Sequence, residues 1–209
     1  MKWQGIDSLP LHSLFAQASA VAHFHPSSFH SSFLTNSGVM HIILETPRLI
    51  LRQFTVADAA LVHQLNRNPE VVEYIHEPVL ENEEAAMKII NDIILPQYKN
   101  KLGRWAIHIK ANNEFIGWCG LKFLEESGEI DLGYRFHPFA WGKGYATEAA
   151  THVLEYGFKI LHLKEVVGRA HIENTASIKV LQKIGMQFIR DAVEDDCPVK
   201  IFREANPDL

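Results

Sequence analysis

Residues 141–158 read WGKGYATEAATHVLEYGF, a glycine-rich turn followed at once by a helical pattern. In the helical part, apolar residues recur at three- and four-residue steps with polar residues between them, which predicts a helix with one buried stripe. Gly142 and Gly144 have no Cβ atom, so their backbone can turn sharply and let a ligand approach the N–H groups. Because a helix N-terminus has unpaired N–H donors, the stretch favours binding of a phosphate or pyrophosphate. The alternative is an ordinary turn between a strand and a helix.

Two common phosphate-binding motifs do not fit this stretch. A P-loop has Ser or Thr after its Gly-Lys pair, but Lys143 is followed by Gly144. A dinucleotide-binding fingerprint would place its third small residue at Thr147, and it would need an acidic residue about twenty positions later that has no clear candidate here. Both of these motif classes are therefore excluded.

Composition limits the class of protein. The chain has 209 residues, 47% hydrophobic and 22% charged, which suits one globular domain with an appendage. The formal charge is −5 and no dense basic run occurs, so we expect no nucleic-acid partner. The sequence has no apolar run of membrane-spanning length and no secretory signal pattern, so we expect a cytoplasmic protein without a membrane partner. Cys119 and Cys197 are too few for a disulfide scaffold.

The beginning of the chain differs from the rest. It is rich in Ser and His, has only two charged residues before position 40, and shows no sustained helical or strand period. We expect residues 1–39 to form a poorly ordered extension and residues 40–209 to form the folded domain. His23 and His25 would suit a metal ion, but no Cys or carboxylate completes a ligand set, so we expect no metal site.

Periodicity and turn residues predict strands and helices along residues 40–209. Strands are predicted at 47–54, 104–110, 114–124, 129–136, 165–172, 186–193 and 198–203. Helices are predicted at 57–67, capped by Thr55 or Asp58, at 81–95, after the opening loop, and at 174–184. This order favours an α/β fold with a mixed sheet, helices on both faces, and a strand–helix–strand crossover in the middle.

Several segments, in order along the chain, resemble one protein family. They are TPRLILRQF (46–54), EFIGWCGL (114–121), DLGYRFHP (131–138), WGKGYATEA (141–149) and NTASIKVLQKIGM (174–186). Over residues 45–204 the chain resembles the GNAT superfamily of acyl-CoA-dependent N-acetyltransferases, and most closely the branch with the ribosomal-protein N-terminal acetyltransferases. The resemblance implies a GNAT-like fold with about seven mostly antiparallel strands, a central splayed parallel pair and about four helices.

The resemblance also implies where acetyl-CoA binds. The superfamily loop has Gln or Arg, two residues, Gly, one residue, then Gly or Ala, and Trp141, Gly144 and Ala146 take these places. Trp141 departs from the superfamily residue, although this branch often has Trp there. The pyrophosphate is expected on the backbone of Gly142, Lys143, Gly144, Tyr145 and Ala146. The pantetheine arm is expected on exposed strand backbone at Tyr134, Arg135 and Phe136.

The chemistry requires a proton acceptor. Reference pKa values near 8 for an α-amine and about 10.4 for lysine leave the neutral, attacking form a minority at pH 7. Glu129 and Asp131 alternate with apolar residues along a predicted strand, so both project to one face unless a bulge intervenes. Either could act as the base, directly or through water, and Asp131 leads because it lies nearer the loop. The alternative is a pair of solvated strand residues.

The last predicted helix begins at Asn174 and Ser177. Asn is a preferred N-cap residue, so a cap alone would explain this start. In the family, an Asn here reaches the pantetheine or the reacting end, and many members have a Tyr seven residues later that protonates the departing thiolate. That place is Leu181 in this chain. The resemblance therefore makes Ser177 the candidate for hydrogen-bonding or protonating the thiolate.

Three functions remain open. The first is acetyl transfer to a peptide or protein N-terminus, and the second is the same reaction on a small amine such as a polyamine, an amino acid or an antibiotic. The third is a domain that binds acyl-CoA as a sensor without turnover, which the missing tyrosine would favour. We expect either a monomer or a homodimer.

Overall fold

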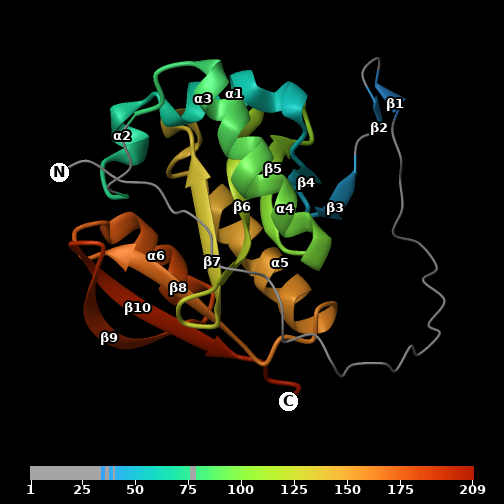
Figure 1. The fold of residues 1–209 in the computed structure, drawn as a ribbon. Coiled ribbons are helices and arrows are strands. Elements are labelled where there is room, and N and C mark those ends of the chain that lie inside the picture. The colour runs from blue at the N-terminus through green and yellow to red at the C-terminus, as the bar shows by residue number, and fades with distance from the viewer. Residues whose placement is uncertain (1–33, 36–37, 40, 76–78) are drawn as a thin grey trace, which may run out of the picture. The chain divides into compact units, whose positions relative to one another are not determined.

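The computed structural model describes residues 34–35, 38–39, 41–75 and 79–209. Their main feature is an eight-stranded sheet in the order β3-β4-β5-β6-β7-β8-β10-β9 (Figure 1). The strands are β3 (Ile42–Glu45), β4 (Leu49–Gln53), β5 (Gly103–Ile109), β6 (Phe115–Leu124), β7 (Glu129–Phe136), β8 (Glu165–His171), β9 (Gln187–Glu194) and β10 (Cys197–Ala205). Neighbouring strands are antiparallel except β7 and β8, which are parallel. The predicted mixed sheet is confirmed, with β3 as an additional strand.

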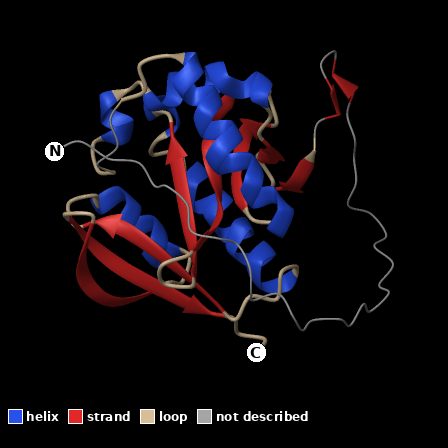
Figure 2. Ribbon diagram, in the orientation of Figure 1, coloured by secondary structure: helices blue, strands red, loops and turns tan. Residues whose placement is uncertain are grey.

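Helices cover both faces of the sheet (Figure 2). The helices are η1 (Val56–Asp58), α1 (Ala59–Asn66), α2 (Pro69–Val72), α3 (Glu83–Ile89), η2 (Ile90–Ile94), α4 (Leu95–Gln97), η3 (Tyr98–Asn100), η4 (Pro138–Ala140), α5 (Tyr145–Lys159) and α6 (Thr175–Lys183). One apolar core, here called the α5–α6 core, contains Val153 of α5 and Leu181 of α6. The opposite core, the α1–α3 core, contains Leu65 of α1 and Ala86 of α3. The predicted arrangement with helices on both faces is confirmed.

Two of the predicted helices differ in detail. The helix expected at 57–67 starts one residue earlier as η1, and the Asp58 carboxylate accepts a hydrogen bond from the Thr55 N–H at 2.8 Å. The helix expected at 81–95 instead runs from α3 through η2, α4 and η3 to Asn100. Pro96 has no N–H to donate, and the five residues of η2, just before Leu95, adopt π geometry where the regular pattern is interrupted.

The parallel pair determines where the loop lies. Parallel neighbours need a long crossover, and here η4, the glycine-rich loop and α5 connect β7 to β8. The loop therefore lies at the carboxyl end of β7, which is where open α/β sheets place their ligand sites. The predicted strand–helix–strand unit is confirmed.

Most of the predicted extension, residues 1–39, lies outside the described residues, as do Met40, His23 and His25. Within it, Leu34–Thr35 (β1) and Gly38–Val39 (β2) form a short antiparallel pair that the sequence did not predict. The boundary at residue 40 stays a prediction. In the described part of the chain, no helix combines the length and apolar character that a membrane span requires.

Candidate active site

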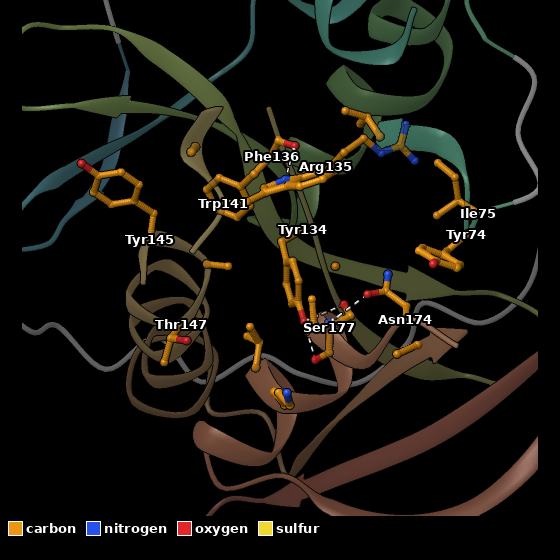
Figure 3. Close-up of a pocket in the computed structure, with 18 of the residues that line it drawn as sticks. Tyr74, Ile75, Tyr134, Arg135, Phe136, Trp141, Tyr145, Thr147, Asn174 and Ser177 are labelled. Carbon is orange, nitrogen blue, oxygen red and sulfur yellow. Dashed lines mark hydrogen bonds between the residues drawn. The ribbon is translucent and has the colours of Figure 1, made fainter. Parts of the chain in front are cut away.

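The central strands β7 and β8 separate shortly after they meet. Their only pairing is between Asp131 and Val167, although β7 continues to Phe136 and β8 to His171. A cavity of about 690 Å³ opens beyond this point (Figure 3). Its walls come from β7, the glycine-rich loop, the start of α5, the end of β8, α6, and residues 70–75. The splayed parallel pair that the resemblance implies is therefore present.

The register shows which backbone groups of β7 face the gap. The His137 N–H donates to the Ile116 carbonyl at 2.9 Å, and antiparallel pairs alternate between bonded and non-bonded positions. The backbone of Arg135 therefore faces β6, whereas the backbone groups of Tyr134 and Phe136 face β8 and the cavity. Of the three residues predicted to offer free backbone, Arg135 instead lines the cavity with its side chain (Figure 3).

The loop has the conformation that its glycines allow. Gly142 has φ 73° and Gly144 has φ 78°, and Gly144 is the N-cap of α5. Both values lie in the left-handed region, which a residue with a Cβ atom rarely adopts. A Cβ on Gly142 would meet no atom within 4 Å, so this side of the loop is open to a ligand. Gly142, Gly144, Tyr145 and Ala146 line the cavity, while the Lys143 carbonyl accepts a hydrogen bond from Arg48 at 3.0 Å.

Trp141, at the first position of the loop motif, turns back toward β7. Its indole Nε1–H donates to the Phe136 carbonyl at 2.9 Å (Figure 3). That carbonyl belongs to one of the two residues whose backbone faces the gap. The Trp141 side chain therefore contacts the strand that is predicted to hold the pantetheine arm.

A pair of hydroxyls joins β7 to α6. Asn174 caps α6, because its Oδ1 accepts the Ser177 N–H at 3.0 Å. The Ser177 Oγ–H donates to Tyr134 Oη at 2.9 Å, and the Tyr134 hydroxyl donates to the Ser177 carbonyl at 3.1 Å (Figure 3). Burial raises the pKa of the Tyr134 phenol, so it keeps its proton at neutral pH. Leu181, at the position where the resemblance implied a Tyr, lies in the α5–α6 core.

The two predicted carboxylates share one arginine. Glu129 and Asp131 project to one face, as predicted, because the β6–β7 register has no bulge. Arg169 Nη1 lies 2.9 Å from Asp131 Oδ1, Nη2 lies 2.6 Å from Glu129 Oε2, and Nε lies 2.9 Å from Glu194 Oε2. The guanidinium of one β8 residue thus pairs with carboxylates of β7 and β9.

The two carboxylates differ in their proton affinity. Burial raises the pKa of Asp131, and the charge and hydrogen bond of Arg169 offset this only in part. Burial also acts to raise the pKa of Glu129, but hydrogen bonds from Arg169 and Ser127, together with the charges of Arg169 and Arg203, outweigh it and lower that pKa. Asp131 lines the cavity and Glu129 does not. Asp131 is therefore the better placed proton acceptor of the two.

The cavity passes from one face of the sheet to the other. Tyr134 packs against the α5–α6 core. Asp131 lies on the opposite face, because a Cβ on Gly133 would lie 3.9 Å from Asp131 Oδ2 and 3.3 Å from Trp118, which packs against the α1–α3 core. A molecule held on the α5 side can therefore meet, in the gap, a second molecule that enters from the α1 side.

The sequence missed several cavity residues. Glu70, Glu73 and Tyr74 line the cavity from α2 and the turn after it, and the Tyr74 ring lies 5.4 Å from the His171 ring. The sequence contains little indication of these residues, because α2 is a single turn and its segment has a pattern typical of a loop. The position of Arg169 could have been interpreted from the sequence. A cation inside the apolar strand EVVGRAH predicts anionic partners, because a buried charge must be paired.

His171 also lines the cavity. Its Nδ1 accepts the Glu173 N–H at 3.2 Å. A neutral imidazole whose Nδ1 accepts a hydrogen bond carries its proton on Nε2, so Nε2 is a donor.

In the residues that the structure describes, no group of three or more His, Cys, Asp or Glu side chains could hold a metal ion.

Known proteins with similar sequences and folds agree with this geometry. Residues 48–187 match the family model for the acetyltransferase (GNAT) domain. The uncharacterized N-acetyltransferase p20 of Bacillus licheniformis is 35% identical over 148 residues, which cover 69% of this chain and 82% of p20. A spermidine N(1)-acetyltransferase of Vibrio cholerae is 25% identical over 141 residues, covering 66% of this chain and 78% of the relative.

Solved structures share the architecture. A GNAT-family acetyltransferase from Bacillus anthracis superimposes with a TM-score of 0.68 at 25% identity, covering 78% of this chain and 97% of that one. The ribosomal L7/L12 alpha-N-protein acetyltransferase RimL superimposes with a TM-score of 0.72 over 84% of this chain and 99% of RimL. RimL is 16% identical, so this second likeness concerns the fold alone.

The loop can be tested with Gly144→Val. A β-branched residue resists φ 78°, so the loop should change shape and the affinity for CoA in calorimetry should fall at least ten-fold. Gly128→Val is the matched control, because Gly128 has φ 70° in the β6–β7 turn and lies away from the cavity. Equal affinity of the folded Gly144→Val variant and the wild type would contradict this ligand site.

Proposed function

The chain belongs to the family of GNAT acetyltransferase domains, and we propose that it transfers an acetyl group from acetyl-CoA to a primary amine by direct attack. The observation that carries this proposal is the gap between β7 and β8, which has free backbone along one wall and the glycine-rich loop at its end. A fully paired sheet would leave no room for an extended arm.

The residues present fit acetyl-CoA as a cosubstrate. The open side of Gly142 and the N-terminus of α5 suit a pyrophosphate, since N–H donors and the helix dipole favour an anion. The backbone groups of Tyr134 and the N–H of Phe136 suit the amide groups of a pantetheine arm, since the Phe136 carbonyl already accepts the Trp141 indole N–H. The thioester would then lie in the gap, near the level of the Tyr134–Ser177 hydroxyl pair.

On the opposite side, Asp131 is proposed as the general base. The attacking amine must lose a proton, and a carboxylate with a raised pKa accepts it more readily than an ordinary one. Arg169 holds the Asp131 carboxylate in place, so Arg169 is a positioning residue. The proton acceptor and the hydroxyl pair lie on opposite faces of the sheet, which matches an amine arriving on one side and a thiolate leaving on the other.

The hydroxyl pair is proposed as the proton donor to the departing thiolate. The Tyr134 phenol is protonated at neutral pH, accepts the Ser177 Oγ–H and donates to the Ser177 carbonyl. The family position at Leu181 is apolar here, and Tyr134 supplies a phenol from β7 instead. Rotation of the Tyr134 O–H toward the sulfur would pass its proton to the thiolate, and the phenolate left behind would keep the hydrogen bond from Ser177 Oγ–H and regain a proton from solvent.

The part of the cavity that residues 70–75 line, where the acceptor amine would enter, favours a cationic amine. Glu70 and Glu73 line it with exposed carboxylates, which attract a cation toward the site more than they strengthen its binding. A relative is named a spermidine N(1)-acetyltransferase. Both observations favour a small polyamine, which carries several positive charges, over a peptide N-terminus, which carries one.

Acetyl transfer would be measured by thiol release from acetyl-CoA with spermidine, lysine and short peptides as acceptors. We expect turnover with spermidine and a lower kcat/KM with the peptides. Turnover with peptides alone would contradict the acceptor class and leave the reaction standing. CoA binding without thiol release from any acceptor would show a sensor domain and overturn the proposed activity.

Ser177→Ala tests the hydroxyl pair. Loss of a positioned proton donor should lower kcat at least ten-fold with little change in CoA affinity, because the interaction strengthens in the transition state. The helix cap is retained, since Asn174 bonds to the Ser177 backbone N–H. Tyr134→Phe should show a similar loss, and the double variant little more than either single one, because the hydroxyls act as a unit. Full kcat in both single variants would refute this role.

Asp131→Asn tests the base. At pH 7 we expect kcat to fall about a hundred-fold. The deficit should shrink as the pH rises toward the pKa of the acceptor amine, because more of the amine is then already neutral and needs no base. Glu165→Gln, an exposed carboxylate on β8, is the control. A larger loss in Glu129→Gln than in Asp131→Asn would assign the base to Glu129.

A further inference from the structure

The turn between β3 and β4 is bonded to the first turn of α5. Thr46 Oγ1 donates to Glu148 Oε1 at 2.5 Å, and the Arg48 backbone N–H donates to the same oxygen at 2.9 Å. Arg48 Nε donates to Glu148 Oε2 at 2.5 Å. We call Thr46, Arg48 and Glu148 the clasp. It joins segments that lie about a hundred residues apart in the sequence.

The clasp reaches the glycine-rich loop through Arg48. Arg48 Nη1 donates to the Lys143 carbonyl at 3.0 Å, and the guanidinium lies 4.5 Å from the centroid of the Tyr145 ring. A Cβ on Gly144 would lie 3.5 Å from Arg48 Nη2. One side chain therefore contacts Lys143 and Tyr145, on either side of Gly144, and limits the conformations of the loop.

The charges of the clasp also matter for an anionic ligand. Burial acts to raise the pKa of Glu148, but hydrogen bonds from Thr46 and Arg48 lower it, so Glu148 is ionised at neutral pH. A carboxylate in the first turn of α5 would repel a pyrophosphate at the same helix end. Arg48 neutralises it, and the Arg48 side chain remains 46% exposed beside the loop while that of Glu148 is 12% exposed.

We propose that Arg48 is a positioning residue for the pyrophosphate of acyl-CoA. It fixes the backbone of residues 143–145 in the binding conformation and cancels the repulsion from Glu148. The inference rests on the proposed function, because it takes the loop as the pyrophosphate site. Arg48 itself takes no part in the reaction chemistry.

The experiment compares two ligands, CoA and pantetheine, which lacks the pyrophosphate and the 3′-phosphoadenosine attached to it. In Arg48→Met, the dissociation constant of CoA should rise at least ten-fold, whereas that of pantetheine should stay within two-fold of the wild-type value. A clasp that only stabilises the fold would move the melting temperature without changing the ratio of the two constants. Lys110→Met is the matched control, because Lys110 pairs with Glu45 of β3 at 2.8 Å and does not touch the loop.

Two further variants separate position from charge. Arg48→Lys keeps the charge but loses the fork that reaches both Glu148 and Lys143, so it should still bind CoA more weakly than the wild type. It also provides the same ligand comparison if Arg48→Met fails to fold. In Arg48→Met/Glu148→Gln the repulsion is gone, so part of the CoA affinity should return relative to Arg48→Met.

The outcomes are distinct. Wild-type CoA affinity in Arg48→Met, or an equal loss for CoA and pantetheine, would overturn the inference while the proposed function stands. A wild-type protein that binds neither ligand would overturn the proposed function instead.

Discussion

The single backbone pairing between Asp131 and Val167 is the constraint on which the rest of the site depends. On their outer sides, β7 pairs with β6 from Glu129 to Phe136, and β8 pairs with β10 along its whole length. Each strand is therefore held by its antiparallel neighbour and does not need the other. This allows the middle of the sheet to open without loss of the fold, at the cost of backbone groups left without a strand partner. The Trp141 indole satisfies one of these groups at Phe136.

Side chains replace the missing backbone bonds near the point where the strands part. Arg169 of β8 is bonded to Asp131 and Glu129 of β7, so an ion-pair cluster holds the two strands where their ladder ends. Farther along the gap, the hydroxyls of Tyr134 and Ser177 connect β7 to α6. The groups proposed for proton transfer are thus the same groups that fix the width of the opening. A change at either place would alter both chemistry and geometry.

The sequence predicted the features that depend on local pattern. Periodicity gave the strands of the central sheet and the two helices after the loop, and the positive φ values at Gly142 and Gly144 agree with their lack of a Cβ atom. The sequence did not predict α2, which is one turn long, or the π turn before Pro96. It also missed the Arg169 cluster and the Tyr134–Ser177 pair, because their partners lie 25 or more positions apart and meet only when the sheet forms.

The gap between β7 and β8 also affects how fast the protein is degraded in a cell. A ligand that binds only the folded chain stabilises it by about 2.7 kcal/mol at a hundred-fold excess over its dissociation constant. Degradation of transiently opened molecules follows their equilibrium population. If acyl-CoA binds in the gap between β7 and β8, cells with a high acyl-CoA concentration would retain more of this enzyme than cells with a low one, at the same rate of synthesis. Supply of the acetyl donor would then set enzyme abundance by mass action, without a dedicated regulator.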